Sequence, residues 1–129
     1  VSTQSTGTHK MKQFSGQVVQ GYQNGRKLGF RTANVNCSID IDEGVYIAKC
    51  ELRNQIYGAM VFIGKAETFG HSHKTYETHI LHDFNDEFYG EQITVQLLEK
   101  IRDNQKFECL EILKKQLQND KIQASNYFK

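Results

Sequence analysis

The segment from Gly25 to Asn34 combines residue types that can bind phosphate and a hard metal ion. Glycines at 25 and 29 let the backbone approach a ligand and present its N–H groups, and the two cations between them suit a phosphate. Thr32 and Asn34 then offer two neutral oxygens to an ion such as magnesium. The segment fits neither the Walker loop nor the dinucleotide fingerprint, so its spacing alone favours a surface turn with two scattered glycines.

A second candidate is Glu77, which follows a polar loop at residues 64–75 and opens an otherwise apolar strand. A carboxylate in that place could accept a proton from a substrate hydroxyl group. A solvated glutamate at a strand end would have the same pattern. His71 and His73 form a His-x-His pair, but without a third ligand at suitable spacing the pair gives little support for a metal site.

The third candidate segment, residues 101–107, contains Arg102 and Phe107 and lies between the last predicted strand and a C-terminal helix. An arginine and an aromatic ring beside the mouth of a barrel could bind a flat ring or an anion. Alternatively, the segment is a helix-entry loop in which Phe107 packs the helix against the core. The residue types fit both interpretations equally.

Short strands must position these candidates. Residues 55–64 are apolar on both parities, which predicts a strand buried on both faces. Residues 92–97 alternate strictly, which predicts that Ile93 and the apolar residues two and four positions later face inward. Arg53 and Asn54 form a two-residue link that is typical of a hairpin. The predicted strands are residues 14–20, 44–52, 55–64, 75–82 and 92–97.

From about Cys109 to about Tyr127 the apolar residues follow the period of an amphipathic helix. We expect this helix to bury its apolar face against the sheet. The residues of that face are Leu110, Leu113, Leu117 and Ala124. Short strands at close spacing followed by a single terminal helix imply a small antiparallel barrel with a helical cap.

The composition limits the functional classes. The chain has 129 residues, of which 38% are hydrophobic and 24% charged, as expected for one soluble globular domain with a real core. The formal net charge is +1 with interleaved signs, which argues against a nucleic-acid partner. No apolar run approaches the ~20 residues that cross a bilayer, so we expect no membrane partner. We expect residues 1–12 to form a polar tail or linker and residues 13–129 to form the domain.

The three cysteines, Cys37, Cys50 and Cys109, show no paired spacing. An odd number of cysteines without a CxxC motif predicts reduced thiols in a cytoplasmic protein. No secretory signal is visible in the first dozen residues. Nothing in the sequence requires more than a monomer.

Several motifs occur in this chain in a fixed order. Because of these motifs and their order, the chain resembles the riboflavin kinase family over about residues 13 to 125. The motifs are Gly16-x-Val18-Val19-x-Gly21, Gly29-Phe30-Arg31-Thr32-Ala33-Asn34, Gly44-Val45-Tyr46, Ile63-Gly64, Glu77-Thr78-His79-Ile80, Asp83-Phe84, Phe88-Tyr89-Gly90, Ile101-Arg102, Lys106-Phe107, Leu110 and Asp120. The forms around Glu77 and Tyr89 look more like the stand-alone, eukaryote-like enzymes than the bacterial bifunctional ones. The resemblance implies a six-stranded antiparallel Greek-key β-barrel with a C-terminal α-helix.

The resemblance also implies a reaction, the transfer of the γ-phosphate of ATP to the ribityl 5′-hydroxyl of riboflavin, which gives FMN and ADP. Thr32 and Asn34 match the positions that hold magnesium, for which manganese or zinc are alternatives, and Glu77 matches the catalytic carboxylate. The matches to nucleotide-contacting positions are Gly21, Arg26, Thr32, Ile80, His82 and Tyr89. The matches to positions near the flavin are Arg102, Gln105 and Phe107.

The sequence departs from the family pattern at several positions. Arg31 replaces the usual proline, which should loosen the metal loop and add a cation beside the phosphates. Cys109 replaces the usual serine at the start of the helix, which should weaken its N-cap by roughly 1 kcal/mol. Strict alternation also puts Glu77 on the opposite strand face from Ile80 and His82, so a shared site would require a bulge or a strand end.

Two other functions remain open from the sequence. The first is a non-catalytic flavin- or nucleotide-binding module of the same fold, in which Arg31 has disabled the chemistry. The second is a small barrel that binds single-stranded nucleic acid through aromatic side chains on a basic face. The near-neutral net charge opposes the second alternative.

Overall fold

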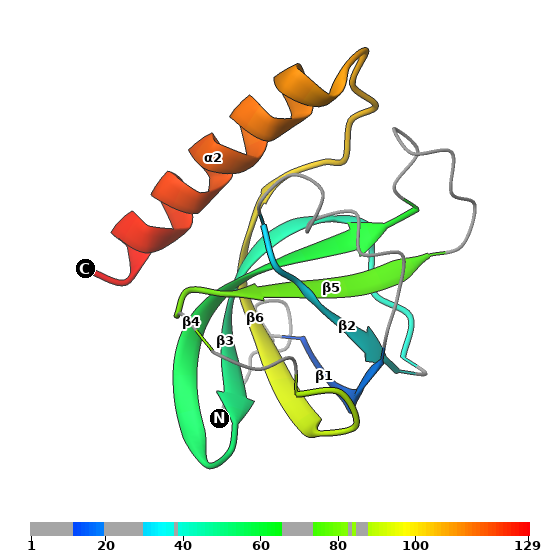
Figure 1. Ribbon diagram of the computed structural model, residues 1–129, viewed down its shortest axis with the longest axis vertical. Coiled ribbons are helices and arrows are strands. Elements are labelled where there is room, and N and C mark those ends of the chain that lie inside the picture. Colours follow the sequence, from blue (N-terminus) through cyan, green and yellow to red (C-terminus); the bar gives the residue numbers. More distant parts are fainter. Residues whose placement is uncertain (1–11, 20–29, 38, 66–73, 83, 85–87) are drawn as a thin grey trace, which may run out of the picture.

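The computed structural model describes residues 12–19, 30–37, 39–65, 74–82, 84 and 88–129. Within these residues, six strands form a closed antiparallel barrel with one helix on its outside (Figure 1). The elements are β1 (Gln13–Val19), β2 (Ala33–Asn36), β3 (Gly44–Leu52), β4 (Gln55–Gly64), β5 (Thr75–Ile80), β6 (Gln92–Arg102) and α2 (Leu110–Tyr127).

The strand order around the barrel is β1-β2-β5-β4-β3-β6, and every neighbouring pair is antiparallel. The consecutive strands β3, β4 and β5 lie side by side, and β6 returns to pair with β3. This is the Greek-key arrangement. The six-stranded Greek-key barrel with a C-terminal helix, implied by the resemblance, is therefore confirmed.

The predicted strands agree with the structure to different degrees. The bounds of β3 and β4 are those predicted, whereas β5 ends two residues early, at Ile80. Strand β6 continues five residues beyond the predicted end, to Arg102. Its pairing with β3 shifts register twice, and such irregularities break the alternation that a sequence pattern can detect. The short strand β2 was not among the predicted strands.

The predicted hairpin between β3 and β4 is confirmed. Its two turn residues, Arg53 and Asn54, have φ values of 54° and 63°, so both adopt the left-handed conformation that a type I′ turn needs. Arg53 is held there by Glu91, whose Oε1 accepts a hydrogen bond from Arg53 Nε at 2.9 Å. Its guanidinium also lies 5.6 Å from the centre of the Phe88 ring.

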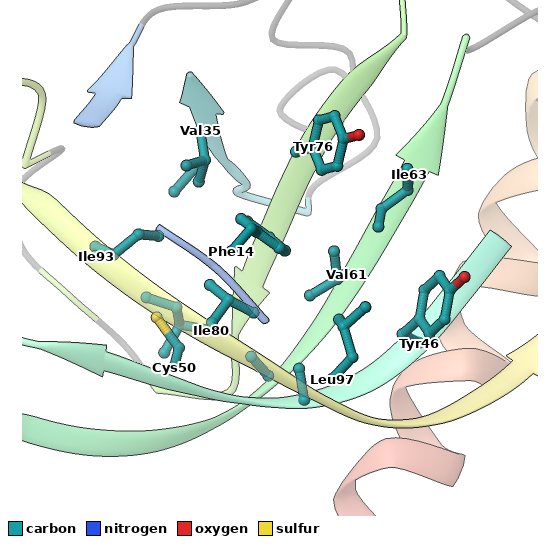
Figure 2. Packing of buried hydrophobic residues seen from close by; sticks show 14 of the residues in the cluster. Phe14, Val35, Tyr46, Cys50, Val61, Ile63, Tyr76, Ile80, Ile93 and Leu97 are labelled. Atoms are coloured by element: carbon teal, nitrogen blue, oxygen red, sulfur yellow. The ribbon is translucent and has the colours of Figure 1, made fainter. Parts of the chain in front are cut away.

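The barrel interior is a single apolar core to which all six strands contribute (Figure 2). Ile93, Val95 and Leu97 point into this core, as the alternation of β6 predicted. The labelled side chains in Figure 2 are Phe14, Val35, Tyr46, Cys50, Val61, Ile63, Tyr76, Ile80, Ile93 and Leu97. A filled interior leaves the outer face and the rims of the barrel for ligand binding.

Helix α2 covers the outer face of β4. Met60 and Phe62 of this strand point outward and pack under the helix, while Ala59, Val61 and Ile63 point into the barrel. The prediction that this strand is buried on both faces is therefore confirmed for its second half. No helix in the described part of the chain is long and apolar enough to span a membrane.

The prediction that the helix buries Leu110 is wrong. Leu113 and Leu117 pack against Phe30 and Phe62, and Ala124 packs against Met60, but Leu110 is 46% exposed. The contacts of the helix with the barrel begin one turn later than the sequence period suggests. The helix therefore buries two leucines and an alanine rather than three leucines.

Candidate active site

The pairing of β2 with β5 brings the first two sequence candidates together. In this pairing Asn34 lies opposite Glu77. Val35 and Tyr76 point into the barrel, so their neighbours Asn34 and Glu77 point outward on the same face. Thr32, which immediately precedes β2, donates a hydrogen bond from Oγ1 to Glu77 Oε1 at 2.9 Å. A hydroxyl, an amide and a carboxylate thus meet although 45 residues separate Thr32 from Glu77.

The second oxygen of the Glu77 carboxylate also has a partner. Thr75 lies two residues earlier on the same strand face, and its hydroxyl is 3.3 Å from Glu77 Oε2. Glu77 is only half-buried, so its carboxylate can still be reached from outside the barrel. The hydrogen bond from Thr32 and the contact with the Thr75 hydroxyl therefore orient a carboxylate that a substrate could approach.

The donor set fits a magnesium ion. Because the Thr32 hydroxyl donates its proton to Glu77, the lone pairs of its oxygen stay available for a cation. The amide of Asn34 can offer a second neutral oxygen from the neighbouring position. Among the described residues there is no group of three or more histidines, cysteines or acids that could hold a metal by itself. Two neutral oxygens beside one carboxylate suit a magnesium ion that takes its other ligands from water and phosphate.

Contacts of Arg31 fix the segment that leads to Thr32. The Arg31 carbonyl oxygen lies 2.7 Å from Nδ1 of His79, and its guanidinium donates from Nη1 to the Phe84 carbonyl oxygen at 3.1 Å. The ring of Phe30 packs edge-on against His79. These contacts oppose the loosening that the absent proline would cause.

Aromatic rings gather beyond the end of β5, where two of the predicted nucleotide-contacting residues lie. The ring of His82 is 4.9 Å from that of Tyr57 and 4.8 Å from that of Phe84, and Phe84 contacts Phe88 at 5.0 Å. Tyr89 follows directly and is 45% exposed. The exposed rings of His82 and Tyr89 are of a kind that can stack against a base.

Ile80 lies elsewhere. Its side chain is inside the barrel and 7% exposed, on the opposite face of β5 from Glu77. The register of β5 with β4 is continuous from Thr75 to Ile80, so β5 has no bulge that would turn both residues to one side. The structure therefore does not bring Ile80 to the carboxylate. The predicted site residues Gly21 and Arg26, and the His71–His73 pair, lie outside the described residues.

The third candidate segment is organised around an ion pair between β6 and α2. Arg102 donates to the Asp120 carboxylate from Nε at 3.0 Å and from Nη2 at 2.8 Å. Asp120 is 2% exposed and also accepts a hydrogen bond from Gln116 Nε2 at 3.0 Å. The Phe107 ring lies 5.9 Å from the Arg102 guanidinium. Arg102 and Phe107 are thus brought together, and Gln105 lies exposed in the same segment.

The sequence analysis assigned no site role to Thr75 or Asp120, although the position of each in the sequence indicates one. Thr75 is two residues from Glu77 in a strand, the spacing that places side chains on one face. Asp120 lies between Leu117 and Ala124 on the buried face of the helix. A carboxylate on an apolar helix face requires a cationic partner.

Comparison with known proteins identifies the family. The family described as Flavokinase: Riboflavin kinase matches residues 8–128, so the chain belongs to the riboflavin kinase family, as its motifs predicted. Human riboflavin kinase is 34% identical over 113 residues, which are 81% of this chain and 73% of the human protein. The RNA-binding riboflavin kinase RibR of Bacillus subtilis is 42% identical over 108 residues, 82% of this chain and 46% of that protein.

A solved structure, that of a protein named as a macrolide-efflux protein from Streptococcus pneumoniae, is similar in fold and sequence. It matches with a TM-score of 0.77 and 36% identity, and the alignment covers 88% of this chain and 38% of that chain. The chain spans only 18%, 46% and 37% of the length of three bacterial relatives. The identities to the human and Bacillus proteins do not single out the stand-alone form, so the predicted closeness to that form stays a prediction.

Proposed function

We propose that the chain is a riboflavin kinase domain that transfers the γ-phosphate of ATP to the ribityl 5′-hydroxyl of riboflavin, giving FMN and ADP. Membership of the riboflavin kinase family supports this reaction. The observation that carries the proposal is the hydrogen bond between Thr32 Oγ1 and Glu77 Oε1, which joins the segment proposed to bind the metal to the Glu77 carboxylate.

In this proposal Glu77 accepts the proton of the riboflavin 5′-hydroxyl. A primary alcohol is a very weak acid, so the carboxylate takes the proton late, as the bond to phosphorus forms. Thr32 and Thr75 hold the two carboxylate oxygens, and this fixes the direction from which the hydroxyl must approach. Phosphoryl transfer depends mainly on such positioning.

Thr32 and Asn34 would hold the magnesium ion beside Glu77. When bound there, the ion would neutralise charge on the phosphates of ATP. Manganese or zinc remain alternatives to it. The hydrogen bond between Thr32 Oγ1 and Glu77 Oε1 supports this assignment, because it joins the two side chains to which these roles are given.

The two substrates would bind on different sides of Glu77. His82 and Tyr89 would contact the nucleotide, together with Gly21 and Arg26, and the aromatic rings next to His82 offer a stacking surface for adenine. Ile80 would contribute only by shaping the strand from within the barrel. Arg102, Gln105 and Phe107 would contact the flavin in a slot between the barrel rim and α2.

The test is to incubate the protein with riboflavin, ATP and magnesium and to look for FMN by chromatography. Formation of FMN and ADP in equal amounts is the expected result. If riboflavin and nucleotide both bind but no FMN forms, the chain is a non-catalytic binding module. Salt-dependent binding of single-stranded nucleic acid with no flavin binding would instead favour the nucleic-acid-binding barrel.

A further inference from the structure

The segment between β6 and α2 is attached to the barrel by Asn104. In Figure 1 this segment leads from the end of β6 to the start of the helix. The side-chain amide of Asn104 donates from Nδ2 to the carbonyl oxygen of Ile63 at 2.8 Å, and it lies 3.5 Å from Glu43 Oε1. Asn104 therefore ties the segment to the last residues of β4.

This attachment depends on the glycine next to Ile63. A Cβ atom on Gly64 would lie 2.2 Å from Nδ2 of Asn104, which is closer than atoms can approach, and 3.2 Å from its Cγ, which is a tight contact. The amide of Asn104 thus occupies the space that any side chain at position 64 would fill. The third neighbour of such a Cβ, Glu43 Oε1, is at 3.5 Å, an ordinary contact. A side chain at position 64 would therefore push the Asn104 amide away from the Ile63 carbonyl.

The same glycine lies next to the carboxylate site on its other side. Gly64 pairs with Thr75 in the β4–β5 ladder, and the Thr75 hydroxyl is 3.3 Å from the Gly64 carbonyl oxygen. That hydroxyl is also 3.3 Å from Glu77 Oε2. A short chain of contacts therefore runs from Asn104 through Gly64 and Thr75 to the carboxylate.

The start of the segment is held as well. Arg102 is locked by the buried carboxylate of Asp120, and Phe107 packs near the Arg102 guanidinium. Asn104 lies between these two residues in the sequence and is fixed to a different element, β4. Two anchors on different elements, at Arg102 and Asn104, fix where the segment leaves the barrel and the direction in which the following residues, up to Phe107, continue.

We propose that Asn104 is a positioning residue for the flavin: it holds the segment from Arg102 to Phe107 against the end of β4, at a fixed place relative to Glu77. This inference rests on the proposed riboflavin kinase function. Asn104 acts through its neighbours, because its amide is turned to the Ile63 carbonyl. Loss of the attachment should affect flavin binding and leave nucleotide binding intact.

The test measures flavin and nucleotide separately. Riboflavin binding is followed by quenching of its fluorescence, without turnover, and KM is measured for riboflavin and for ATP. For Asn104→Ala we expect riboflavin binding to weaken about fivefold or more and the KM for ATP to change less than twofold, as one lost hydrogen bond permits. Asn104→Asp keeps the shape of the side chain but removes the N–H donor, so it should weaken riboflavin binding as Asn104→Ala does. Asn119→Ala, an exposed change on α2, is the control and should alter neither value.

Gly64→Ala should break the hydrogen bond between Asn104 and the Ile63 carbonyl without changing Asn104 itself, because the new methyl group must displace the Asn104 amide. It should weaken riboflavin binding as Asn104→Ala does. In the double variant the methyl group has room, so the two effects should not add. Additive effects, or equal weakening of riboflavin and ATP, would show general damage and overturn the positioning role.

Wild-type measurements separate the two proposals. If wild-type protein neither binds riboflavin nor forms FMN, the proposed function fails, and the role of Asn104 fails with it. If wild-type protein binds riboflavin and the Asn104 variants bind it equally well, only the role of Asn104 is wrong.

Discussion

At the scale of single residues, the candidate site depends on how one carboxylate is oriented. Thr32 reaches Glu77 from the start of β2, and Thr75 reaches it from its own strand. The Thr32 hydroxyl has a single proton, which it gives to Glu77, so its oxygen keeps both lone pairs. The Thr32 oxygen can therefore serve a metal ion while its proton holds the base. In the proposed mechanism, this shared use of one hydroxyl requires the base and the metal-binding residues to lie next to each other.

Replacement of Glu77 by glutamine tests the base directly. Glutamine has almost the same shape and can still accept a hydrogen bond, but it cannot take a proton from the substrate hydroxyl. We expect kcat to fall tenfold or more while nucleotide binding, measured by calorimetry, persists. Glu51→Gln, an exposed change on β3, is the matched control. An unchanged kcat in Glu77→Gln would remove Glu77 from the mechanism.

The residue types at the site could be predicted from the sequence, but their contacts could not. Thr32, Asn34 and Glu77 are recognisable by type and by motif. Their meeting depends on the register of β2 against β5, and β2 has only four residues, too few for a pattern to indicate. Asn104 had no motif, because its role follows from a close approach to Gly64 across the fold.

At the scale of elements, regular patterns predicted well and irregular ones did not. Strands β3 and β4 and their two-residue turn have the predicted bounds because turn residues define their ends. Strand β6 was predicted too short because its second half is irregularly paired with β3. Leu110 was misplaced because a helical period shows which residues share a face but not where the partner surface begins.

The ion pair between Arg102 and Asp120 should contribute strongly to the docking of α2. Asp120→Ala leaves the Arg102 guanidinium, 18% exposed, without its carboxylate. We expect the free energy of unfolding to fall by about 3 kcal/mol, measured by urea denaturation. Asp103→Ala removes only the exposed pair with Lys100 and should leave stability unchanged. Equal stability of the two variants would show that the buried pair does not hold the helix.

A better N-cap at the start of α2 should raise the stability of the protein. Cys109 has the extended backbone of an N-cap residue, with φ −147° and ψ 162°, but its side chain makes no capping hydrogen bond. Cys109→Ser supplies an oxygen that can accept from the first free N–H groups of the helix, so unfolding should cost about 1 kcal/mol more. Thermal denaturation followed by circular dichroism measures the gain. Cys37→Ser, which lies outside any helix, should give none, and a gain in both variants would rule out capping as the cause.

At the scale of the whole molecule, the closed barrel is a non-local property. Closure requires β1 to pair with both β2 and β6, although β6 is about eighty residues further along the chain. Local patterns indicated strands, a helix and a barrel, but only the ordered motifs implied six strands in a Greek key. The order of strands around a barrel is set by long-range pairing, which leaves no period in the sequence.

We expect the barrel to unfold only as a whole, and the chemical reactivity of Cys50 can test this expectation. Its side chain is fully buried in the core, and burial raises the pKa of its thiol to about 12. Because only the thiolate reacts, a maleimide or disulfide reagent at pH 8 should modify exposed Cys109 quickly and Cys50 only after global unfolding. In increasing urea the rate at Cys50 should rise with the unfolded fraction, while the rate at Cys109 should not. Rapid modification of Cys50 in native buffer would mean that the barrel opens locally between strands, and the carboxylate site on β5 could then not depend on a rigid scaffold.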